Sequence, residues 1–512
     1  MQGKNVKTTV NPTRKLAVSK KYISQNQLIL EGFETPFEQK LTKNNRWVLL
    51  SKQIPWDDIV ILYDRQFQSK EGRPPINGRI VLASVIIKHM LDLTDRETIQ
   101  QISENMFMQY FLGYSSFTNE TPFDPSLFVD IRERLSLDIM NKITELVLKH
   151  NIENFNAIEQ AALKEANNED NQKNDPPTPP DQENKGTLLM DATVSPQNIT
   201  YPTDLKVLNS SRIKSEKIID LLYDKELHGQ TKVRTYRNNA RKDFLNTAKK
   251  KRKTQQEIIK ANKKQLAYLQ RNLGHIEVLI KAYKSTDKLP PLKEKYWKYL
   301  ETIKTVNTQQ SQKYIQKIDK IENRIVNIHQ PHVRPIVRGK EGVKTEFGSK
   351  LQVSLIDGFS FIDKLSWENF NEGCELKVSV ENYKKKFGYY PERVLADQIY
   401  CTRENRKWLK ERGVTLVAKP LGRPAKEAVS IHISPGERNP IEGKFGQAKV
   451  GYGMNKILAK LKETSESWIA TINLVLNLVR LMKVVPSWLE VKFLEIIHII
   501  FNQKNYVIGF RV

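Results

Sequence analysis

Residues 188 to 195 read Leu-Leu-Met-Asp-Ala-Thr-Val-Ser, an apolar run with a single carboxylate, Asp191, in its middle. A short apolar run of this kind predicts a buried strand. A second run, Arg-Val-Leu-Ala-Asp-Gln-Ile-Tyr at 393–400, also carries a single carboxylate, Asp397. We therefore expect two acids on strands, far apart in the sequence and close enough in space to act together.

A third acid, Glu442, lies in residues 437–453, which read Glu-Arg-Asn-Pro-Ile-Glu-Gly-Lys-Phe-Gly-Gln-Ala-Lys-Val-Gly-Tyr-Gly. The spacing of Arg438, Glu442 and Lys449 is i, i+4 and i+11, so one continuous helix would present all three on nearly the same face. A carboxylate between two cations suits a metal-binding acid beside a polyanion. A second interpretation stays open: with Asn439 as N-cap, Glu442 would complete a capping box, and Arg438 would precede the helix.

The elements around these acids predict a mixed α/β sheet. Residues 351–356 and 359–365 read as a β-hairpin that turns at Asp357-Gly358. Helices are expected at about 376–387 and 404–412, a further strand at 414–418, and a long apolar helix at the end of the domain. The sheet must accommodate a large helical insertion between its first strand and the hairpin.

The insertion, residues 205–340, is helical and basic by pattern. Ile, Asn, Leu, Leu, Leu, Ile and Ile occupy positions 259, 262, 266, 269, 273, 276 and 280, a 3-4 seam with one polar break. Leu289-Pro-Pro291 ends that seam, and a second one follows. We predict a coiled-coil hairpin arm of two long antiparallel helices, about 45 Å long at 1.5 Å per residue.

The rest of the chain divides by composition. Residues 1–46 form a polar segment, and 47–150 read as an all-helical domain in which Thr94-Asp-Arg-Glu97 is a capping box. A proline-rich linker is expected over 151–186. The domain that contains the three acids would then comprise 187–204 and 341–483, followed by a tail over 484–512.

The chain has 512 residues and a net charge of +25, which indicates a polyanionic partner. Two cysteines exclude a cysteine zinc site and a disulfide framework. No leader peptide is recognisable, and Asn473, Asn477 and Arg480 interrupt the apolar run at 461–485, which favours a buried helix over a membrane span. We therefore expect a cytoplasmic protein that is not at a membrane.

Three carboxylates on such a basic chain point to metal-assisted chemistry on nucleic acid. Two divalent cations about 4 Å apart can activate a water and stabilise the leaving oxygen of a phosphodiester, and Mg²⁺ prefers hard oxygen ligands. The alternative for Asp191 and for Asp397 is a strand-end acid bonded to nearby backbone. Asp204 fits a turn or an N-cap better than a catalytic role.

Two basic stretches are candidates for DNA contact. Residues 249–253 are Lys249, Lys250, Lys251, Arg252 and Lys253, which would form either a solvated helix face or a set of phosphate contacts. The loop at 329–340 contains two histidines and ends at Arg338 and Lys340. Without a neighbouring cysteine the histidines make a poor metal site, so we interpret this loop as positioning DNA.

Several motifs resemble those of bacterial insertion-sequence transposases of the DDE type. They are Gln330-Pro-His-Val-Arg-Pro-Ile-Val-Arg-Gly-Lys340, Glu346-Phe-Gly-Ser-Lys350, Gly388-Tyr-Tyr-Pro-Glu-Arg-Val-Leu-Ala-Asp397, Leu421-Gly-Arg-Pro424 and 437–460. The resemblance covers most of residues 47–483. It implies a ribonuclease H-like catalytic domain, preceded by an all-helical domain in which terminal-repeat DNA binding is expected.

By this resemblance Asp191 matches the acid of the first strand, Asp397 that of the fourth strand and Glu442 that of the later helix. All three would be catalytic and would hold two Mg²⁺ or Mn²⁺ ions, with Asp191 touching both. Related transposases carry the signature Tyr-x2-Arg-x3-Glu-x6-Lys. Arg438, Glu442 and Lys449 fit that signature, whereas Pro435 stands at the tyrosine position. Arg438 and Lys449 would then contact DNA.

The resemblance implies a DNA transposase that cleaves the ends of its element and transfers the strands into target DNA. Its partners would be double-stranded DNA, as terminal inverted repeats and target, and a second copy of the chain in a synaptic complex. The alternative is an inactive or domesticated relative that binds DNA without cutting it. The inserted arm departs from the family, where the large insertion commonly lies late in the domain.

Overall fold

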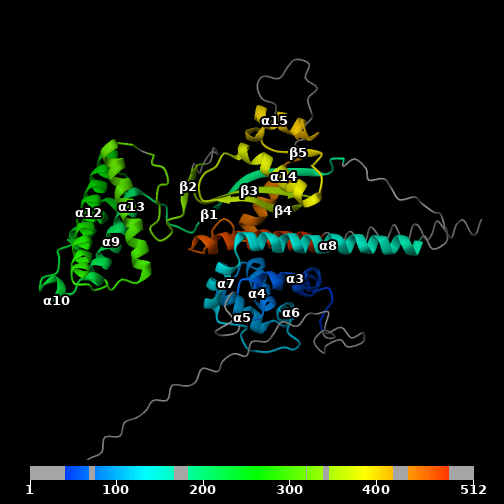
Figure 1. The fold of residues 1–512 in the computed structure, drawn as a ribbon, viewed down its shortest axis with the longest axis horizontal. Coiled ribbons are helices and arrows are strands. Elements are labelled where there is room, and N and C mark those ends of the chain that lie inside the picture. The colour runs from blue at the N-terminus through cyan, green and yellow to red at the C-terminus, as the bar shows by residue number, and fades with distance from the viewer. Residues whose placement is uncertain are drawn as a thin grey trace, which may run out of the picture. The chain divides into compact units, whose positions relative to one another are not determined.

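The computed structural model of the protein describes residues 41–67, 75–166, 183–318, 320–337, 345–418 and 436–483. The described residues fall into two compact units. The first contains those up to 166 together with 481–483, and the second contains those from 183 to 480. In Figure 1 the helices of the first unit are blue to cyan, and the second unit runs from green to orange.

Every regular element described in the first unit is a helix. The helices are α2 (Arg46–Gln53), α3 (Trp56–Asp64), α4 (Gly78–Met90), α5 (Asp95–Glu104), α6 (Met106–Phe111), η2 (Pro125–Leu127), α7 (Phe128–Arg134) and α8 (Leu137–Ala166). All 13 residues of α4 are buried, so this helix forms the centre of the unit. The capping box predicted at Thr94 and Glu97 is confirmed at the start of α5.

Helix α8 corrects one predicted boundary. It continues to Ala166, so residues 151–166, which we expected to belong to the linker, are helical. The apolar stripe that begins at Ile139 supports a helix up to residue 150, but composition gave no signal for the following turns. Residues 167–182, which hold the prolines of the predicted linker, lie outside the described residues.

The second unit contains a mixed six-stranded sheet. Its strands are β1 (Thr187–Pro196), β2 (Arg334–Val337), β3 (Thr345–Ile356), β4 (Phe359–Ser366), β5 (Arg393–Leu395) and β6 (Thr415–Val417). Their order is β2-β3-β1-β5-β6, and β4 also pairs with β3. Strands β1, β3 and β4 pair antiparallel, whereas β5 and β6 continue the sheet in parallel from β1.

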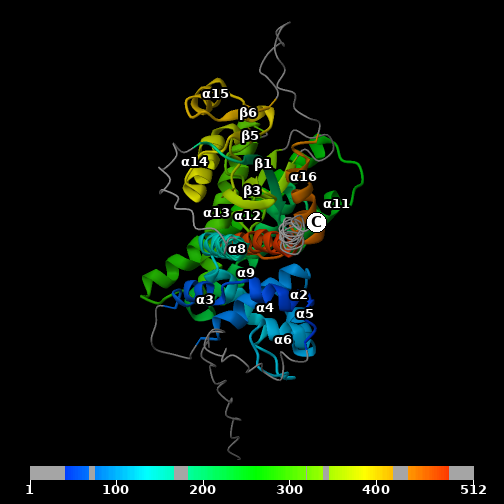
Figure 2. The ribbon, with the colours of Figure 1, turned by 90° about the vertical axis from the view of Figure 1, so that its right-hand side faces the viewer.

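The sheet has a helix on each face. Helix α14 (Leu376–Phe387) contacts β1 and β4, and α16 (Asn439–Gly446) contacts β1. Figure 2 shows the two helices on opposite sides of β1. Because side chains alternate along a strand, Leu188 and Met190 of β1 are fully buried, while Leu189 and Asp191 lie on the other face and are half-buried.

The hairpin β3–β4 turns as predicted at Asp357 and Gly358, whose φ angles are +51° and +83°. Two consecutive positive φ angles define the turn that best matches strand twist, and the pair Asp-Gly adopts them readily. The predicted buried helix is also confirmed over 462–483. The asparagines that interrupt its apolar run, Asn473 and Asn477, both donate from Nδ2 to the backbone carbonyl of Ser360 on β4.

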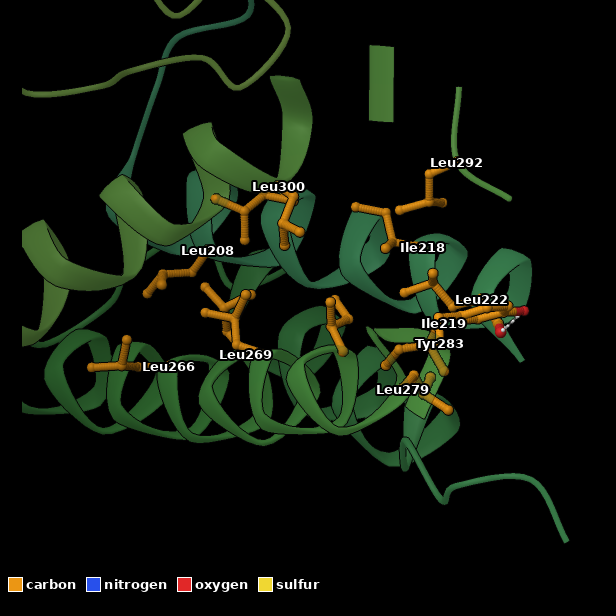
Figure 3. Packing of buried hydrophobic residues seen from close by; sticks show 13 residues of the cluster. Leu208, Ile218, Ile219, Leu222, Leu266, Leu269, Leu279, Tyr283, Leu292 and Leu300 are labelled. Carbon is orange, nitrogen blue, oxygen red and sulfur yellow. Dashed lines mark hydrogen bonds between the residues drawn. The ribbon is translucent and has the colours of Figure 1, made fainter. Parts of the chain in front are cut away.

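The insertion between β1 and β2 is a helical bundle. It comprises α9 (Asp204–Leu222), α10 (Lys225–His228), α11 (Arg237–Ala248), α12 (Gln255–Ser285) and α13 (Glu294–Gln316). Its position after the first strand agrees with the prediction. The two long helices predicted around the Pro-Pro turn are present as α12 and α13 and contact each other, but the prediction missed α9, which packs against both and supplies much of the shared core. Figure 3 shows Leu208 and Ile218 of that core facing Leu269 and its neighbours on α12.

The side chain of Asp204, the first residue of α9, connects the start of α9 to the end of α13 and to the segment that follows α13. Its carboxylate accepts hydrogen bonds from Gln310 and Lys313 of α13 at 2.9 and 2.8 Å, and from Arg324 at 2.6 Å. Burial opposes its charge, but these partners prevail and lower its pKa. The N-cap of α9 is Thr203 rather than Asp204. Asp204 therefore has a structural role, which accounts for an acid so close to β1.

His332, which precedes β2, makes the stability of the second unit depend on pH. Its ring packs edge-on against that of Trp367, with 4.3 Å between the two ring centroids. Its Nε2 is buried without a hydrogen-bond partner in the described part of the chain. Burial lowers its pKa to about 4, whereas a histidine in an unfolded chain titrates near 6.5. Between those values the unfolded state binds the extra proton, so acid favours unfolding.

We expect the free energy of unfolding of this unit to fall as pH is lowered from about 6.5 to about 4. The variant His332→Phe keeps a ring against Trp367 but cannot titrate, so its stability should decline less over that range. Urea unfolding of both proteins at several pH values measures the difference. Parallel pH profiles for the two proteins would contradict this role for His332.

Among the described residues, no helix combines the length and the apolar character that crossing a membrane requires.

Candidate active site

Asp191 lies in the middle of β1, paired with Val353 of β3. Its side chain is 19% exposed, and Oδ1 accepts a hydrogen bond from the Ala192 N–H at 2.8 Å. Burial raises the pKa of this carboxyl above its usual value; the Ala192 N–H and the Arg438 guanidinium oppose that rise, while the charges of Glu372 and Asp397 add to it. The fold therefore holds a carboxylate where a nearby cation would strongly stabilise its charge.

Asp397 reaches the same place through strand register. Strand β5 is parallel to β1, and their last pair is Leu189 with Leu395. Asp191 and Asp397 each follow a residue of that pair by two positions. The pairing of the strands therefore places the two acids beside each other. The predicted strand over 393–400 is shorter than expected: β5 ends at Leu395, and Asp397 caps the short helix η4 (Gln398–Tyr400) through the Gln398 N–H.

Arg438 joins the two aspartates. Its Nη2 lies 3.6 Å from Oδ2 of Asp191, and its Nη1 donates to Oδ1 of Asp397 at 3.3 Å. The Asp397 side chain is 59% exposed, whereas that of Arg438 is 25% exposed. The Nε of Arg438 is buried without a hydrogen-bond partner in the described residues. The positive charge of one guanidinium thus offsets the charges of two carboxylates, and its Nε donor stays unused within those residues.

Helix α16 agrees in part with the second interpretation of residues 437–453, since Arg438 precedes the helix and Glu442 lies in its first turn. Its N-cap is Arg438 with no capping side chain, so Asn439 is already helical and the proposed capping box of Asn439 and Glu442 is wrong. Lys449 lies in a following π-helical turn, η5 (Gln447–Gly451), and is half-buried. Because Arg438 precedes the helix and the wider π turn changes the spacing, the three residues do not share one α-helical face.

Glu442 lies on α16 with its side chain exposed. Its helix contacts β1, the strand of Asp191. Among the described residues, however, no three histidine, cysteine, aspartate or glutamate side chains come close enough together to hold a metal ion. The structure therefore brings Asp191 and Asp397 together at Arg438 and leaves Glu442 apart from them.

The predicted DNA-contacting residues have separate positions. Lys249 to Lys253 lie in the loop after α11, all exposed, and Lys250 pairs with Glu257 at the start of α12. They form a loop and not the helix face that the simpler interpretation assumed. Arg338 and Lys340 lie outside the described residues.

Sequence reasoning missed a second charged pair beside the site. Lys350 of β3 pairs with Glu372 at 2.8 Å and also donates to the Phe370 carbonyl at 2.9 Å. Glu372 begins η3 (Glu372–Glu375), in which a side chain at Gly373 would meet the Ile399 carbonyl at 2.6 Å, so η3 packs tightly on η4. Lys350 belongs to the motif Glu346-Phe-Gly-Ser-Lys350. Glu372 follows a loop, and no hydrophobic periodicity around it predicted an element there.

A cavity of 330 Å³ opens on the same face of the sheet as the aspartates. Leu189, Leu355 and Leu395 contribute to its lining, and Arg393 and Glu437, which pair at 3.0 Å, stand beside them. Two of these leucines precede Asp191 and Asp397 by two residues, although neither acid lines the cavity itself. An apolar hollow with a charged pair beside reactive groups is a suitable place for part of a substrate.

Comparison with known families bears directly on this site. Residues 394–479 match the family described as transposase DDE domain, and residues 35–134 match a family described as transposase domain. These matches confirm the resemblance to the bacterial insertion-sequence DDE transposases. The transposase DDE match includes Asp397, Arg438 and Glu442, and the other match includes α2 to α7 of the first unit. Both matches indicate a transposase function.

A curated relative adds a weaker likeness. The chain is 27% identical over 160 residues to a protein of Rhizobium meliloti named uncharacterized protein ORF8 in nfe locus. The matched part is 31% of this chain, and it spans 66% of the length of the relative. No solved structure matches the chain significantly.

Proposed function

We propose that the protein is a DDE transposase that cleaves DNA at the ends of its element and joins the freed 3′-hydroxyls to target DNA. The observation that carries this proposal is the pairing of β1 with β5, which places Asp191 and Asp397 beside each other. Arg438 bridges the two carboxylates. Two of these three residues lie within the stretch that matches the transposase DDE domain.

The sheet topology supports a ribonuclease H-like fold for this domain. Three antiparallel strands, β4, β3 and β1, are followed by β5 and β6 in parallel. The first acid stands on the central strand β1 and the second follows its parallel neighbour, as the resemblance implies. On this proposal the helical bundle is an insertion into the connection after the first strand, and 187–204 with 341–483 form the catalytic domain.

The donor set fits divalent cations, because Asp191 and Asp397 offer hard carboxylate oxygens at one site, where the Arg438 guanidinium supplies the positive charge in this structure. Asp191, Asp397 and Glu442 would hold two Mg²⁺ or Mn²⁺ ions, and Glu442 would join from the neighbouring helix α16. Such ions supply activation of the attacking water or hydroxyl and stabilisation of the leaving oxygen.

The chain's own residues have distinct tasks in this proposal. Arg438 lies between the two aspartates with 25% of its side chain exposed, so part of its guanidinium can turn to a phosphate oxygen next to the scissile bond. Lys449, on the turn after α16, would add a second phosphate contact. The cavity beside the aspartates leaves room for a nucleotide adjoining the reacting phosphate.

The same proposal assigns the partners and the place of action. Terminal inverted repeats would bind the helical first unit, and target DNA would reach the catalytic domain with help from residues 249–253. Two copies of the chain would bring two element ends together in a synaptic complex. The reaction would take place on DNA in the cytoplasm, at the nucleoid.

Cleavage of the element's own ends tests the proposed function. The DNA flanking the reading frame should contain inverted repeats, and a labelled fragment carrying one repeat is the substrate. The intact chain should nick this fragment at the repeat boundary with Mg²⁺ or Mn²⁺, but not with EDTA. Salt-sensitive binding of the fragment without nicking under either metal would instead indicate a DNA-binding relative that does not cut.

Arg438 provides a more specific prediction. We expect Arg438→Ala to lower the cleavage rate about 10²-fold, the usual cost of removing one preorganised donor from a reacting centre. Arg438→Lys, which keeps the charge without the two-pronged geometry, should recover only part of that loss. Arg403→Ala, which removes an exposed arginine at the start of α15 (Arg403–Lys410), is the matched control. Equal rates for the two alanine variants would exclude Arg438 from the site.

A further inference from the structure

The helical bundle carries most of the chain's net positive charge. Residues 204–316 hold 27 lysines and arginines against 11 aspartates and glutamates, a net charge of +16 in a chain whose total is +25. The core of the bundle is largely apolar, and apart from the buried pair Arg212 and Glu216 most of its charges lie on the surface. An excess of this size on one element attracts a polyanion.

Within this surface, Tyr236 organises two arginines. The guanidinium carbons of Arg234 and Arg271 lie 5.4 and 4.8 Å from the centre of its ring. Arg234 and Tyr236 precede α11, whereas Arg271 projects from α12, so the cluster joins two segments of the bundle. All three side chains are exposed, and Tyr236 itself is 42% exposed. Packing on an aromatic ring fixes the direction of a guanidinium without consuming its N–H donors.

The two arginines differ from the cations around them. Arg237 forms a two-pronged pair with Asp220, and Lys264 pairs with Asp243 at 2.9 Å. In the described part of the chain, neither Arg234 nor Arg271 makes an ion pair or a hydrogen bond. Their donors are thus fixed in direction and free to bind an anion, whereas the charges of their neighbours are already balanced.

The backbone at Tyr236 adopts a conformation that is unfavourable for a tyrosine. Its φ is +52° and its ψ is +30°, the left-handed region, where a bulky residue costs about 1 kcal/mol or more. Asparagine or glycine would adopt this conformation more easily. A tyrosine kept at a position that disfavours it is consistent with a role for the exposed ring.

We propose that Arg234, Tyr236 and Arg271 form a phosphate clamp that holds the backbone of double-stranded DNA against the bundle. Arg234 and Arg271 contact phosphate oxygens, and Tyr236 is a positioning residue that holds the two guanidiniums apart and in place. The proposal names a contact surface outside the catalytic domain, and it rests on the proposed function only in taking DNA as the polyanion.

The test is DNA binding measured without catalysis. A fluorescent duplex is titrated with the full chain in EDTA at several salt concentrations, so a failure of the cleavage proposal does not affect the result. Each lost phosphate contact lowers the slope of log affinity against log salt by about 0.9. We expect Arg234→Ala with Arg271→Ala to lower the slope by about 2 and to weaken binding at least about tenfold.

The matched control removes two other exposed cations of α12, Lys281→Ala with Lys284→Ala, and thus the same net charge. It should retain a slope close to that of the unchanged chain. Tyr236→Asn should weaken binding about threefold while the melting temperature stays the same or rises, and Tyr236→Phe should bind like the unchanged chain. Equal slopes for the arginine and lysine double variants would overturn the clamp. The clamp would also be overturned if the arginine double variant lost binding to anionic lipid vesicles while its binding to DNA was unaffected.

Discussion

Asp191→Asn is expected to abolish cleavage of element ends, lowering the rate by at least about 10³-fold, while binding of those ends is unchanged. Removing a single preorganised donor already costs about 10²–10³ in rate, and a carboxylate proposed to hold both metal ions should cost more. The substitution exchanges one oxygen for an amide nitrogen of nearly the same size. The measurement is a pair of assays on one labelled end, nicking with Mg²⁺ and retention in EDTA.

The variant should fold, because burial already opposes the charge of Asp191. The amide oxygen of asparagine can accept the same hydrogen bond from the Ala192 N–H. Arg438 would retain Asp397 as a partner. A loss of cleavage in Asp191→Asn can therefore be assigned to chemistry once its melting temperature is found unchanged.

Two further variants complete the experiment. Asp363→Asn removes a buried acid of β4 whose partners are Ser354 and Asn382, away from the catalytic pair, and should cleave at nearly the normal rate. Glu442→Gln should be as inactive as Asp191→Asn if Glu442 joins the pair, and nearly normal if it does not. Full cleavage by Asp191→Asn in Mg²⁺ would remove the central assignment.

The elements that the sequence predicts well are those set by local signals. The bounds of α14, the turn at Asp357-Gly358 and the capping box at Thr94 each follow from a few neighbouring residues, and each agrees with the structure. The core strand β1 was also predictable, because an apolar run of eight residues fits little else at that length. In these cases backbone preference and burial pattern favour the same structure.

The predictions that failed depend on contacts between distant segments. The heptad seam of α12 is real, with Leu266, Leu269, Leu273 and Ile276 buried, but a seam does not specify its partner. The partner is largely α9, 53 residues earlier at the contact of Arg212 with Gln265, and not α13 alone. A Pro-Pro turn between two seams indicated a simple hairpin, because no sequence signal near the seams pointed to α9 as a third helix.

The cluster of candidate catalytic residues shows the same limit. Three acids could be nominated from the sequence, but their convergence depends on the register of β1 and β5 and on where α16 begins. Arg438 was expected beside Glu442 on a helix face, and instead it bridges Asp191 and Asp397. A long arginine side chain that precedes a helix can reach many partners, so only the fold decides among them.

The glycine of the motif Glu346-Phe-Gly-Ser-Lys350 links the fold to the site. Gly348 of β3 pairs with Pro196 of β1 on one side and with Arg334 of β2 on the other. A Cβ at this position would lie 2.0 Å from the Ser195 carbonyl oxygen and 2.8 Å from the Cα of Pro196. Both are backbone atoms, so the clash cannot be relieved by turning a side chain.

Gly348→Ala should therefore destabilise the second unit by about 3 kcal/mol, at the upper end of the usual cost of overpacking. For a domain of this size the melting temperature should fall by roughly 6–12 °C. Because relief of the clash requires β1 to move, and β1 carries Asp191, cleavage should also fall at temperatures where the variant remains folded. Differential scanning calorimetry and the nicking assay measure the two effects.

Gly274→Ala is the matched control, since a Cβ there meets no atom within 4 Å and the residue lies inside α12. Alanine in an open helix interior should stabilise the protein by about 1 kcal/mol, so the two substitutions should shift the melting temperature in opposite directions. Gly348→Ala with a normal melting temperature would show that β1 and β3 can separate without cost. In that case the position of Asp191 would not depend on the close approach of these two strands.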